Sequence, residues 1–393
     1  MQVRVSVMKN LLGAAIAAFF FAVCSPTLAS AQSTGVSQPI KGRYIVQFKE
    51  SVGRPGLTAD ELVRGARGQL HFTYTTAFKG FAATLSDAAV AALRRNPNVL
   101  SIEQDSTVYI EATQTPATWG LDRIDQRSLP LSNTFSYNEA IPGIYAFIVD
   151  TGILANHSEF TGRVQVGLAY DAITSGGSAS DCNGHGTHVA ATVGGATYGV
   201  AKKVLLVPVK VLDCAGSGSI SGVIAGIDYV VKSGLRPALA NMSLGGGASS
   251  ALDAAVANAV SQGVTVVVAA GNSNRDACNH SPARVASAIT VGATDSSDSR
   301  ASYSNFGKCL DLFAPGSSIT SAWYTATNAI ATLSGTSMAS PHVAGVAALV
   351  IGSGIASPSA VVAEIKKNAT SNKVGSAGRG SPNLLLYSPP PAP

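Results

Sequence analysis

The residues with the clearest chemical potential lie in the stretch Gly335–Gly345, which reads GTSMASPHVAG. Ser337 offers a hydroxyl nucleophile where a tight turn enters a predicted helix, and Gly335 permits the sharp turn. Free backbone N–H groups at a helix start favour nearby negative charge. The following residues are apolar on all sides, which indicates a buried helix and therefore a rigid mount for the serine. On this segment alone, an ordinary serine N-cap is an equally good interpretation.

A serine nucleophile needs a base, and the base needs an orienting acid. Asp150 ends the apolar run 144–149, and His185 lies in the segment NGHGTHVA. The chain order Asp, His, Ser is that of subtilisin, whereas chymotrypsin runs His, Asp, Ser. The alternatives are a strand-end turn residue for Asp150 and a metal pair with His188 for His185, although no third ligand is marked. An aspartic protease needs a second carboxylate, and no second DTG or DSG follows.

Three segments resemble the triad segments of the subtilisin-like serine proteases: VDTGI, NGHGTHVA and GTSMASPHVAG. Two more, WGLDRIDQ at 119–126 and NMSLGG at 241–246, resemble the proteinase K and aqualysin branch. The resemblance covers about residues 112–388. It implies a serine endopeptidase in which Ser337 attacks the scissile carbonyl, His185 transfers the proton and Asp150 orients the imidazole. No cofactor is implied for catalysis.

Two other classes of protein were weighed against this interpretation. An esterase or lipase would show Gly-x-Ser-x-Gly, whereas Ala339 stands two residues after Ser337. A binding or inhibitor protein with a decayed protease domain would not be expected to keep every catalytic residue. The complete set of Asp150, His185, Ser337 and Asn272 therefore favours an active peptidase.

The resemblance also implies how a substrate is held. It assigns Asn272, at the end of the apolar run 266–271, to the oxyanion hole together with the Ser337 backbone N–H; otherwise Asn272 is a turn residue. Polypeptide substrates would lie extended between two cleft edges, with broad specificity and an apolar or aromatic residue before the cut. Flexible loops are the alternative interpretation of these edges. The implied substrate-binding residues are Gly216, Ser217, Gly218, Ser243, Leu244, Gly245, Gly246, Ala270 and Gly271.

Structural calcium is implied by the same resemblance, because hard oxygen ligands suit this ion. One site would use the carbonyls of Ala286 and Ala288 with the carboxylate of Asp311. A second site would use Asp122, Asp125 and Gln126.

Four cysteines follow the N-terminal 31 residues: Cys182, Cys214, Cys278 and Cys309. An even count in an exported protein implies disulfides, and four cysteines allow three pairings that sequence alone leaves open. Zinc is the alternative, although no two of them are closely spaced. The resemblance implies the pairs Cys182–Cys214 and Cys278–Cys309.

Residues 1–31 are predicted to be a signal peptide. Arg4 and Lys9 form the basic region, Leu11–Val23 the apolar core and Ala29–Ala31 a small-residue cleavage site. The apolar run is too short for a membrane anchor. We therefore expect a secreted, extracellular protein without an anchor, acting as a monomer.

At 393 residues the chain is expected to hold more than one structural unit. Residues 32–111 are predicted to be a small α+β domain that resembles an inhibitory propeptide, and a permanent N-terminal domain is the alternative. Residues 112–388 would be the catalytic domain, and 389–393 a proline-rich tail. The propeptide would act as an intramolecular inhibitor and folding aid. The precursor is predicted to cut itself between Tyr109 and Ala112.

The elements that must position these residues alternate along the catalytic segment. Strands are predicted at 144–149, 204–211, 237–242, 264–270 and 288–292. Helices are predicted at 187–197, 219–233, 250–262, 337–351 and 358–368. This alternation predicts an α/β fold, a doubly wound mostly parallel sheet with helices on both faces and a site at the carboxyl ends of the strands.

The net charge of +5 is concentrated upstream. Residues 1–31 hold two basic and no acidic residues, 32–111 nine and seven, and the remainder 16 and 15. A nearly neutral catalytic segment offers no basic footprint, so nucleic acid is not expected as a partner.

Overall fold

The computed structural model describes residues 39–106, 113–137 and 143–390. The chain divides into two compact units, Met1–Tyr109 and Ile110–Pro393. This division falls within the predicted processing segment, which lies outside the described residues. The predicted signal peptide and the last three residues of the tail lie outside them as well.

The first unit is an α+β domain, as the sequence predicts. Its antiparallel sheet has the order β2-β3-β1-β4. One core, which includes Val46, Phe48 and Phe81, packs against Val63 of α1 and Val90 of α2. The elements are β1 (Pro39–Phe48), α1 (Pro55–Gly65), β2 (Gln69–Tyr74), β3 (Gly80–Thr84), α2 (Asp87–Leu93) and β4 (Val99–Ser106).

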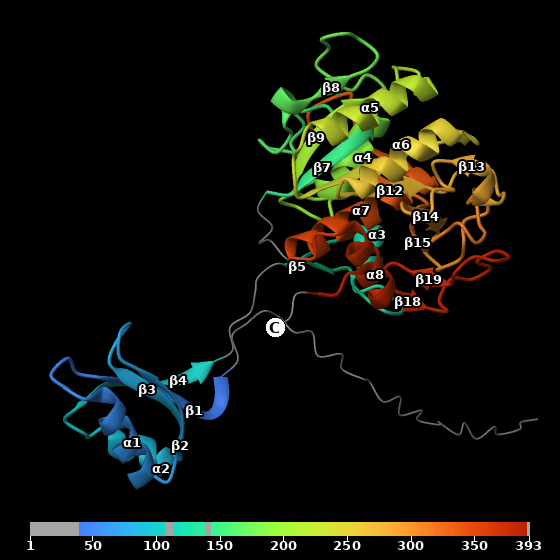
Figure 1. Ribbon diagram of the computed structural model, residues 1–393. Helices are drawn as coiled ribbons and strands as arrows, with labels where there is room; N and C mark the ends of the chain where they lie inside the picture. Colours follow the sequence, from blue (N-terminus) through green and yellow to red (C-terminus); the bar gives the residue numbers. More distant parts are fainter. Residues whose placement is uncertain (1–38, 107–112, 138–142, 391–393) are drawn as a thin grey trace, which may run out of the picture. The chain divides into compact units, whose positions relative to one another are not determined.

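The second unit is built on a nine-stranded sheet of order β18-β19-β15-β14-β12-β10-β7-β9-β8 (Figure 1). All neighbours run parallel except β18 and β19. The strands are β7 (Tyr145–Asp150), β8 (Tyr170–Asp171), β9 (Leu205–Lys210), β10 (Ala238–Met242), β12 (Val264–Ala269), β14 (Ile289–Thr294), β15 (Leu312–Pro315), β18 (Thr370–Ser371) and β19 (Leu384–Leu385). The predicted doubly wound fold is confirmed.

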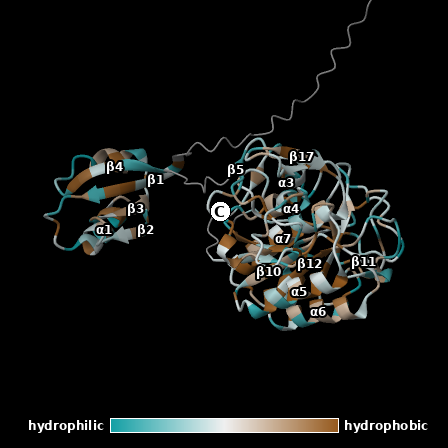
Figure 2. Cartoon of the chain, turned by 90° about the horizontal axis from the view of Figure 1, so that it is seen from above, coloured by the Kyte–Doolittle hydropathy of each residue, from teal (hydrophilic) through white to brown (hydrophobic). Residues whose placement is uncertain are grey.

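Helices cover both faces of this sheet, because its strands carry apolar side chains on alternate sides. Phe147 and Val149 of β7 pack toward α5 and α6, whereas Ala146 and Ile148 pack toward α4 and α7. In Figure 2 the hydrophobic residues of this unit concentrate on central strands such as β10 and β12. The helices are α3 (Trp119–Ile124), α4 (His185–Gly194), α5 (Ile220–Lys232), α6 (Ser250–Ser261), α7 (Thr336–Gly352) and α8 (Pro358–Asn368).

Several elements were not predicted from the sequence. Strands β8, β15, β18 and β19 are short and lack a long apolar run, and two 3₁₀ turns span Val166–Leu168 and Ala277–Asn279. Three two-stranded ribbons also form from short segments with no periodic signal. They are β5 (Thr113–Gln114) with β6 (Phe135–Ser136), β11 (Gly246–Gly247) with β13 (His280–Ser281), and β16 (Ile319–Ala322) with β17 (Ile330–Leu333).

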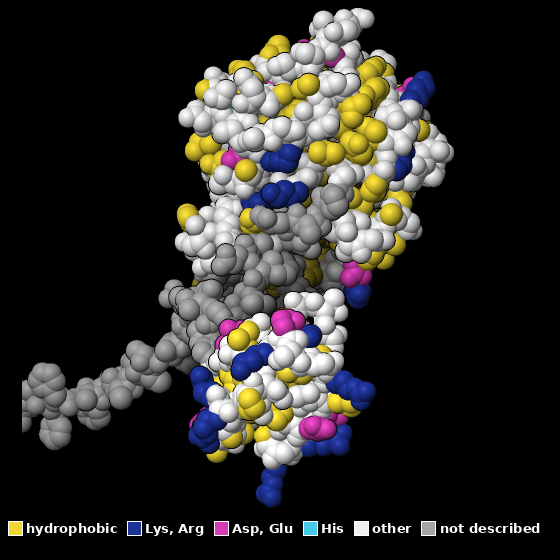
Figure 3. Space-filling model, turned by 90° about the vertical axis from the view of Figure 1, so that its left-hand side faces the viewer, with side chains coloured by type: hydrophobic (Ala, Val, Ile, Leu, Met, Phe, Trp, Pro, Cys, Tyr) yellow, Lys and Arg dark blue, Asp and Glu magenta, His cyan; other side chains and the backbone are white. Residues whose placement is uncertain are grey.

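Two surface properties bear on partners. Within the described ranges, no helix combines the length and apolar composition that crossing a bilayer requires. On the face drawn in Figure 3, basic side chains lie scattered rather than in one continuous stripe.

Candidate active site

Asp150 and His185 meet at the carboxyl end of β7. Asp150 is the last residue of that strand and is fully buried, and His185 is the first residue of α4. The His185 Nδ1 lies 2.7 Å from Asp150 Oδ1, which also accepts the Thr151 N–H at 2.7 Å. A carboxylate on Nδ1 places the imidazole proton there and leaves Nε2 free to accept a proton.

The electrostatics of this pair favour a protonated imidazole. Burial by itself would lower the pKa of His185, but the charge and hydrogen bond of Asp150, with the charge of Asp181, raise that pKa above its ordinary value. A base tuned in this way accepts a proton readily from a neighbouring hydroxyl.

Ser337 is the second residue of α7, and its surroundings hold the start of that helix on β10. Its Oγ donates to the carbonyl of Ser243 at 3.1 Å, and among the described residues it makes no hydrogen bond to His185. The Ser243 hydroxyl donates back to the Ser337 carbonyl at 2.8 Å. That carbonyl lacks its usual helical donor because Pro341, four residues on, has no N–H.

A buried polar network continues beneath Ser337. Asn241, fully buried on β10, donates from Nδ2 to the Ser243 hydroxyl at 2.9 Å. Its Oδ1 accepts the hydroxyl of Ser340 on α7 at 2.7 Å. The network ties α7 to β10, and Ser340 is a contributor that no local sequence signal marks.

Asn272 follows β12 with its amide orientation set by its neighbours. Its Oδ1 accepts both the backbone N–H and the hydroxyl of Thr336, each at 2.8 Å. The Nδ2 donor is therefore left for the pocket that Asn272 lines together with Ser337. A donor beside the nucleophile is the arrangement that an oxyanion hole requires.

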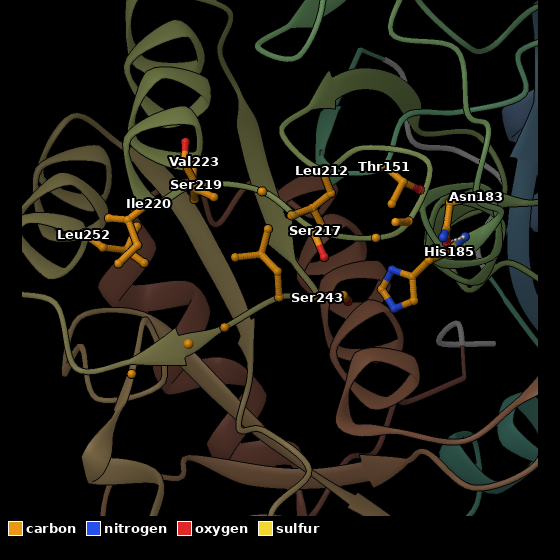
Figure 4. Close-up of a pocket in the computed structure, with 17 residues that line it drawn as sticks. Thr151, Asn183, His185, Leu212, Ser217, Ser219, Ile220, Val223, Ser243 and Leu252 are labelled. Carbon is orange, nitrogen blue, oxygen red and sulfur yellow. Dashed lines mark hydrogen bonds between the residues drawn. The ribbon is translucent and has the colours of Figure 1, made fainter.

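Two adjoining pockets form a cleft around these residues. The first, about 550 Å³, reaches from His185 to apolar Ile220 and Leu252, and Gly216–Gly218 face Ser243–Gly247 across it (Figure 4). The second, about 470 Å³, contains Ser337. The two pockets share the wall Leu244–Gly247. Every predicted substrate-binding residue lines at least one of them.

The second pocket is lined mostly by residues with small side chains. Ala270 and Gly271 line it as predicted, and His280 on β13 lines it as well. His280 pairs through its backbone with Gly247, so the two-stranded ribbon brings it to the site. His280 was not among the predicted site residues, because a lone histidine outside any motif has no sequence signal of its own.

The cysteines pair as the resemblance implies. Disulfides join Cys182 to Cys214 and Cys278 to Cys309. The first ties the loop before His185 to the loop that carries the Gly216–Gly218 edge. His188, the alternative metal partner of His185, is buried and bonded through Nε2 to the Ile319 carbonyl. The two imidazoles therefore have separate partners.

The residues Asp122, Asp125 and Gln126 fit a calcium ion. Asp122 is buried. Burial raises the pKa of Asp125 to about 7; the hydrogen bond from the Ser136 backbone N–H lowers this pKa, and the charge of Asp122 raises it. Gln126 donates from Nε2 to two carbonyls, which leaves Oε1 available as a ligand. The donor set is thus two carboxylates and an amide oxygen, the hard ligands that calcium prefers.

Asp311 differs in the charge of its partners. Among the described residues, the Asp122 carboxylate accepts hydrogen bonds only from neutral groups, those of Ser132 and Asn133, whereas the Asp311 carboxylate is also paired with a cation. Lys366 of α8 lies 3.0 Å from Oδ1, and the Thr290 N–H donates to Oδ2 at 2.9 Å. The Lys366 ammonium thus already pairs with the carboxylate that the predicted calcium ion would use. Calcium at Ala286, Ala288 and Asp311 stays a prediction.

Comparison with known proteins gives two family matches and close relatives. The model of the subtilase family matches residues 143–383, and that of the peptidase inhibitor I9 matches residues 43–111. An extracellular serine proteinase of Thermus sp. (strain Rt41A) is 56% identical, covering 93% of this chain and 95% of that protein. Alkaline serine exoprotease A of Vibrio alginolyticus is 54% identical, over 81% of this chain and 60% of that protein.

A solved structure resembles the second unit. The crystal structure of a cold adapted subtilisin-like serine proteinase is 54% identical, with a TM-score of 0.67. The match covers 70% of this chain and 99% of that one.

Proposed function

Since the chain belongs to the subtilase family and is a subtilisin-like serine proteinase, we propose that Asp150, His185 and Ser337 are its catalytic triad. The observation that carries this proposal is the 2.7 Å hydrogen bond between His185 Nδ1 and Asp150 Oδ1. His185 and Ser337 line the two adjoining pockets of the same cleft. The bond holds the imidazole in the tautomer that can act as a base.

In the proposed mechanism, substrate binding turns the Ser337 hydroxyl from the Ser243 carbonyl toward His185 Nε2. The hydroxyl oxygen attacks the scissile carbonyl as its proton passes to Nε2, and the imidazolium is stabilised by Asp150. The tetrahedral oxyanion accepts hydrogen bonds from Asn272 Nδ2 and the Ser337 backbone N–H. His185 then protonates the leaving amine, and water releases the acyl group by the same route in reverse.

The cleft supports an extended polypeptide as substrate. Backbone groups of Gly216–Gly218 and Ser243–Gly246 offer hydrogen bonds on both sides, independent of the side chains of the peptide. This accounts for broad sequence tolerance. The small residues around Ser337 leave about 470 Å³ for an apolar or aromatic side chain before the cut.

The I9-type domain is proposed to be both the inhibitor and the first substrate of the enzyme. It immediately precedes the catalytic unit in the chain, so its final residues have a high effective concentration at the cleft. We propose that the chain is secreted, cuts itself between Tyr109 and Ala112, and acts as a monomer with calcium held by Asp122, Asp125 and Gln126.

The test is the precursor of Ser337→Ala, which should accumulate uncut and begin near Gln32. N-terminal sequencing of the purified chain measures this directly. Ser334→Ala is the matched control, because Ser334 is a nearby exposed serine whose Oγ only accepts the Ser318 N–H. The control should mature as the parent does. Maturation of Ser337→Ala in a host lacking other proteases would show that Ser337 is not the nucleophile for processing.

A further inference from the structure

A buried carboxylate that the proposed mechanism does not use lies four residues before His185. The Asp181 residue is only 6% exposed, and no ion pair to it forms among the described residues. Its two oxygens accept five hydrogen bonds instead. An uncompensated charge in such a position is costly, so its partners indicate what it holds.

The five bonds join the two segments that carry Asp150 and His185. Oδ1 accepts the Thr151 hydroxyl and the backbone N–H groups of Asn183 and Gly184, each at 2.9 Å. Oδ2 accepts the N–H and the hydroxyl of Thr187, at 2.9 and 2.6 Å. Thr151 directly follows Asp150, whereas Gly184 and Thr187 flank His185.

The Thr151 hydroxyl also connects directly to the start of α4. While it donates to Asp181, its oxygen accepts the N–H of Gly186 at 2.9 Å. Gly186 itself has no room for a side chain, since a Cβ there would lie 2.2 Å from the Gly152 carbonyl oxygen. A carboxylate that merely capped α4 would need only the bonds to Thr187.

We propose that Asp181 is a positioning residue, which holds the Asp150 strand end and the His185 helix start at the separation that proton transfer requires. This inference rests on the proposed triad. Asp181 itself touches neither the substrate nor the nucleophile. Its effect passes through Thr151 and the first turn of α4.

The charge of Asp181 adds a second, separable effect. The titratable groups around His185 are Asp150 on β7, Asp181, His188 on α4 and Lys210 at the end of β9. Of these, the two carboxylates favour the protonated imidazole. Loss of the Asp181 charge should therefore let His185 remain a neutral base at lower pH.

The experiment compares Asp181→Asn, Thr151→Val and Thr151→Ser, each matured from the full precursor by a trace of wild-type enzyme. The pH dependence of kcat and KM on a peptide amide is measured together with Tm. Asp181→Asn should lower kcat by about 10- to 100-fold with little change in KM, because misplacement of the base affects the chemical step. In Asp181→Asn, the acid limb of the pH profile of kcat/KM should also move to lower pH.

Thr151→Val removes the hydroxyl that connects Asp181 to Gly186 but keeps the charge of Asp181. It should lose kcat without a shift of the acid limb, and Thr151→Ser, which keeps the hydroxyl, should restore kcat. Asp171→Asn is the matched control, because Asp171, the last residue of β8, accepts two backbone N–H groups from the loop that follows it. It should leave kcat and the acid limb unchanged.

The outcomes separate this inference from the proposed function. If a serine-directed phosphonylating reagent fails to label Ser337 in the wild type, the triad itself is wrong. If labelling succeeds but Asp181→Asn keeps wild-type kcat and acid limb, or loses Tm alone, the positioning role is overturned. Thr151→Val with full activity overturns it as well, even if Asp181→Asn does not fold.

Discussion

At the residue scale, the amide of Asn272, the proposed oxyanion-hole donor, has its orientation fixed by one neighbour. Thr336 supplies two donors to its Oδ1, so the amide cannot turn over without losing both bonds. Its Nδ2 is consequently the atom presented to the pocket. A donor fixed in advance stabilises the developing oxyanion without reorganisation during the reaction.

Replacing Asn272 by Asp should remove this donor while keeping an acceptor for Thr336. We expect kcat to fall by about 10²–10³, the loss known for the corresponding donor in subtilisin, with little change in Tm. Asn272→Ala should lose kcat similarly and some Tm, because Thr336 then loses its acceptor. Turnover of a peptide amide is the measurement. Unchanged turnover in the aspartate variant would remove Asn272 from the mechanism.

At the scale of elements, one ion pair joins α3 to the turn after β14. Arg123 is fully buried, and its Nε and Nη2 lie 2.6 and 2.9 Å from the two carboxylate oxygens of Asp298. A third donor, Nη1, reaches the Gln126 carbonyl at 2.7 Å. Bidentate geometry with satisfied donors is what makes a buried ion pair tolerable.

Arg123→Met should therefore destabilise the catalytic unit by about 3–5 kcal/mol, because the buried Asp298 carboxylate loses its counterion. The measurement is urea unfolding of the phosphonylated enzyme, in which autolysis is blocked. Adding Asp298→Asn to the Arg123→Met variant should recover part of the lost free energy of unfolding, because it removes the unpaired buried charge. Asparagine also tolerates the positive φ of 64° at this position. Additive losses in the double variant would contradict a coupled pair.

The proposed calcium site lies in the same part of the chain, where α3 meets the segment 132–136. Excess chelator should lower Tm, because an ion bound only by the folded state stabilises it by mass action. Asp125→Asn should abolish this response. Asp311→Asn should keep it, since the Asp311 carboxylate is already matched by Lys366. A response lost in Asp311→Asn and kept in Asp125→Asn would reverse the assignment of the site.

On the scale of the whole molecule, two interior histidines couple stability to pH. Burial lowers the pKa of both His188 and His342 to about 4, although each ring has one bond to a carbonyl, from Ile319 and Met338 respectively. Both lie in the core between α4, α7 and the sheet. In the folded protein they are therefore neutral near pH 7.

The sign of the pH effect follows from these lowered pKa values. Above about pH 6.5 both states hold neutral imidazoles, and as pH falls toward 4 only the unfolded chain takes up protons. The free energy of unfolding should thus decline across this interval, by on the order of 3 kcal/mol per histidine. Urea unfolding of phosphonylated enzyme between pH 7 and 4 measures it. In His342→Phe the decline should be smaller, and an equal decline would contradict the assignment.

Much of this architecture could be predicted from the sequence, because its signals lie in contiguous residues. The apolar run before Asp150 predicts the end of a strand, and the turn at Gly335 predicts the start of a helix that carries a candidate nucleophile. The alternation of runs predicts a doubly wound sheet in the same way. The segments GTSMASPHVAG and NGHGTHVA carry family identity within eleven and eight residues.

Other features were decided only by the tertiary structure, because they join residues far apart in the chain. Arg123 meets Asp298 across 175 positions, and Lys366 pairs with Asp311 across 55. His280 lines the pocket because β13 pairs with β11, and the hydrogen-bond partners of Asp181 come together only when β7 and α4 pack side by side. Such contacts depend on packing geometry, and a buried polar group shows its role only when its hydrogen-bond partners are known.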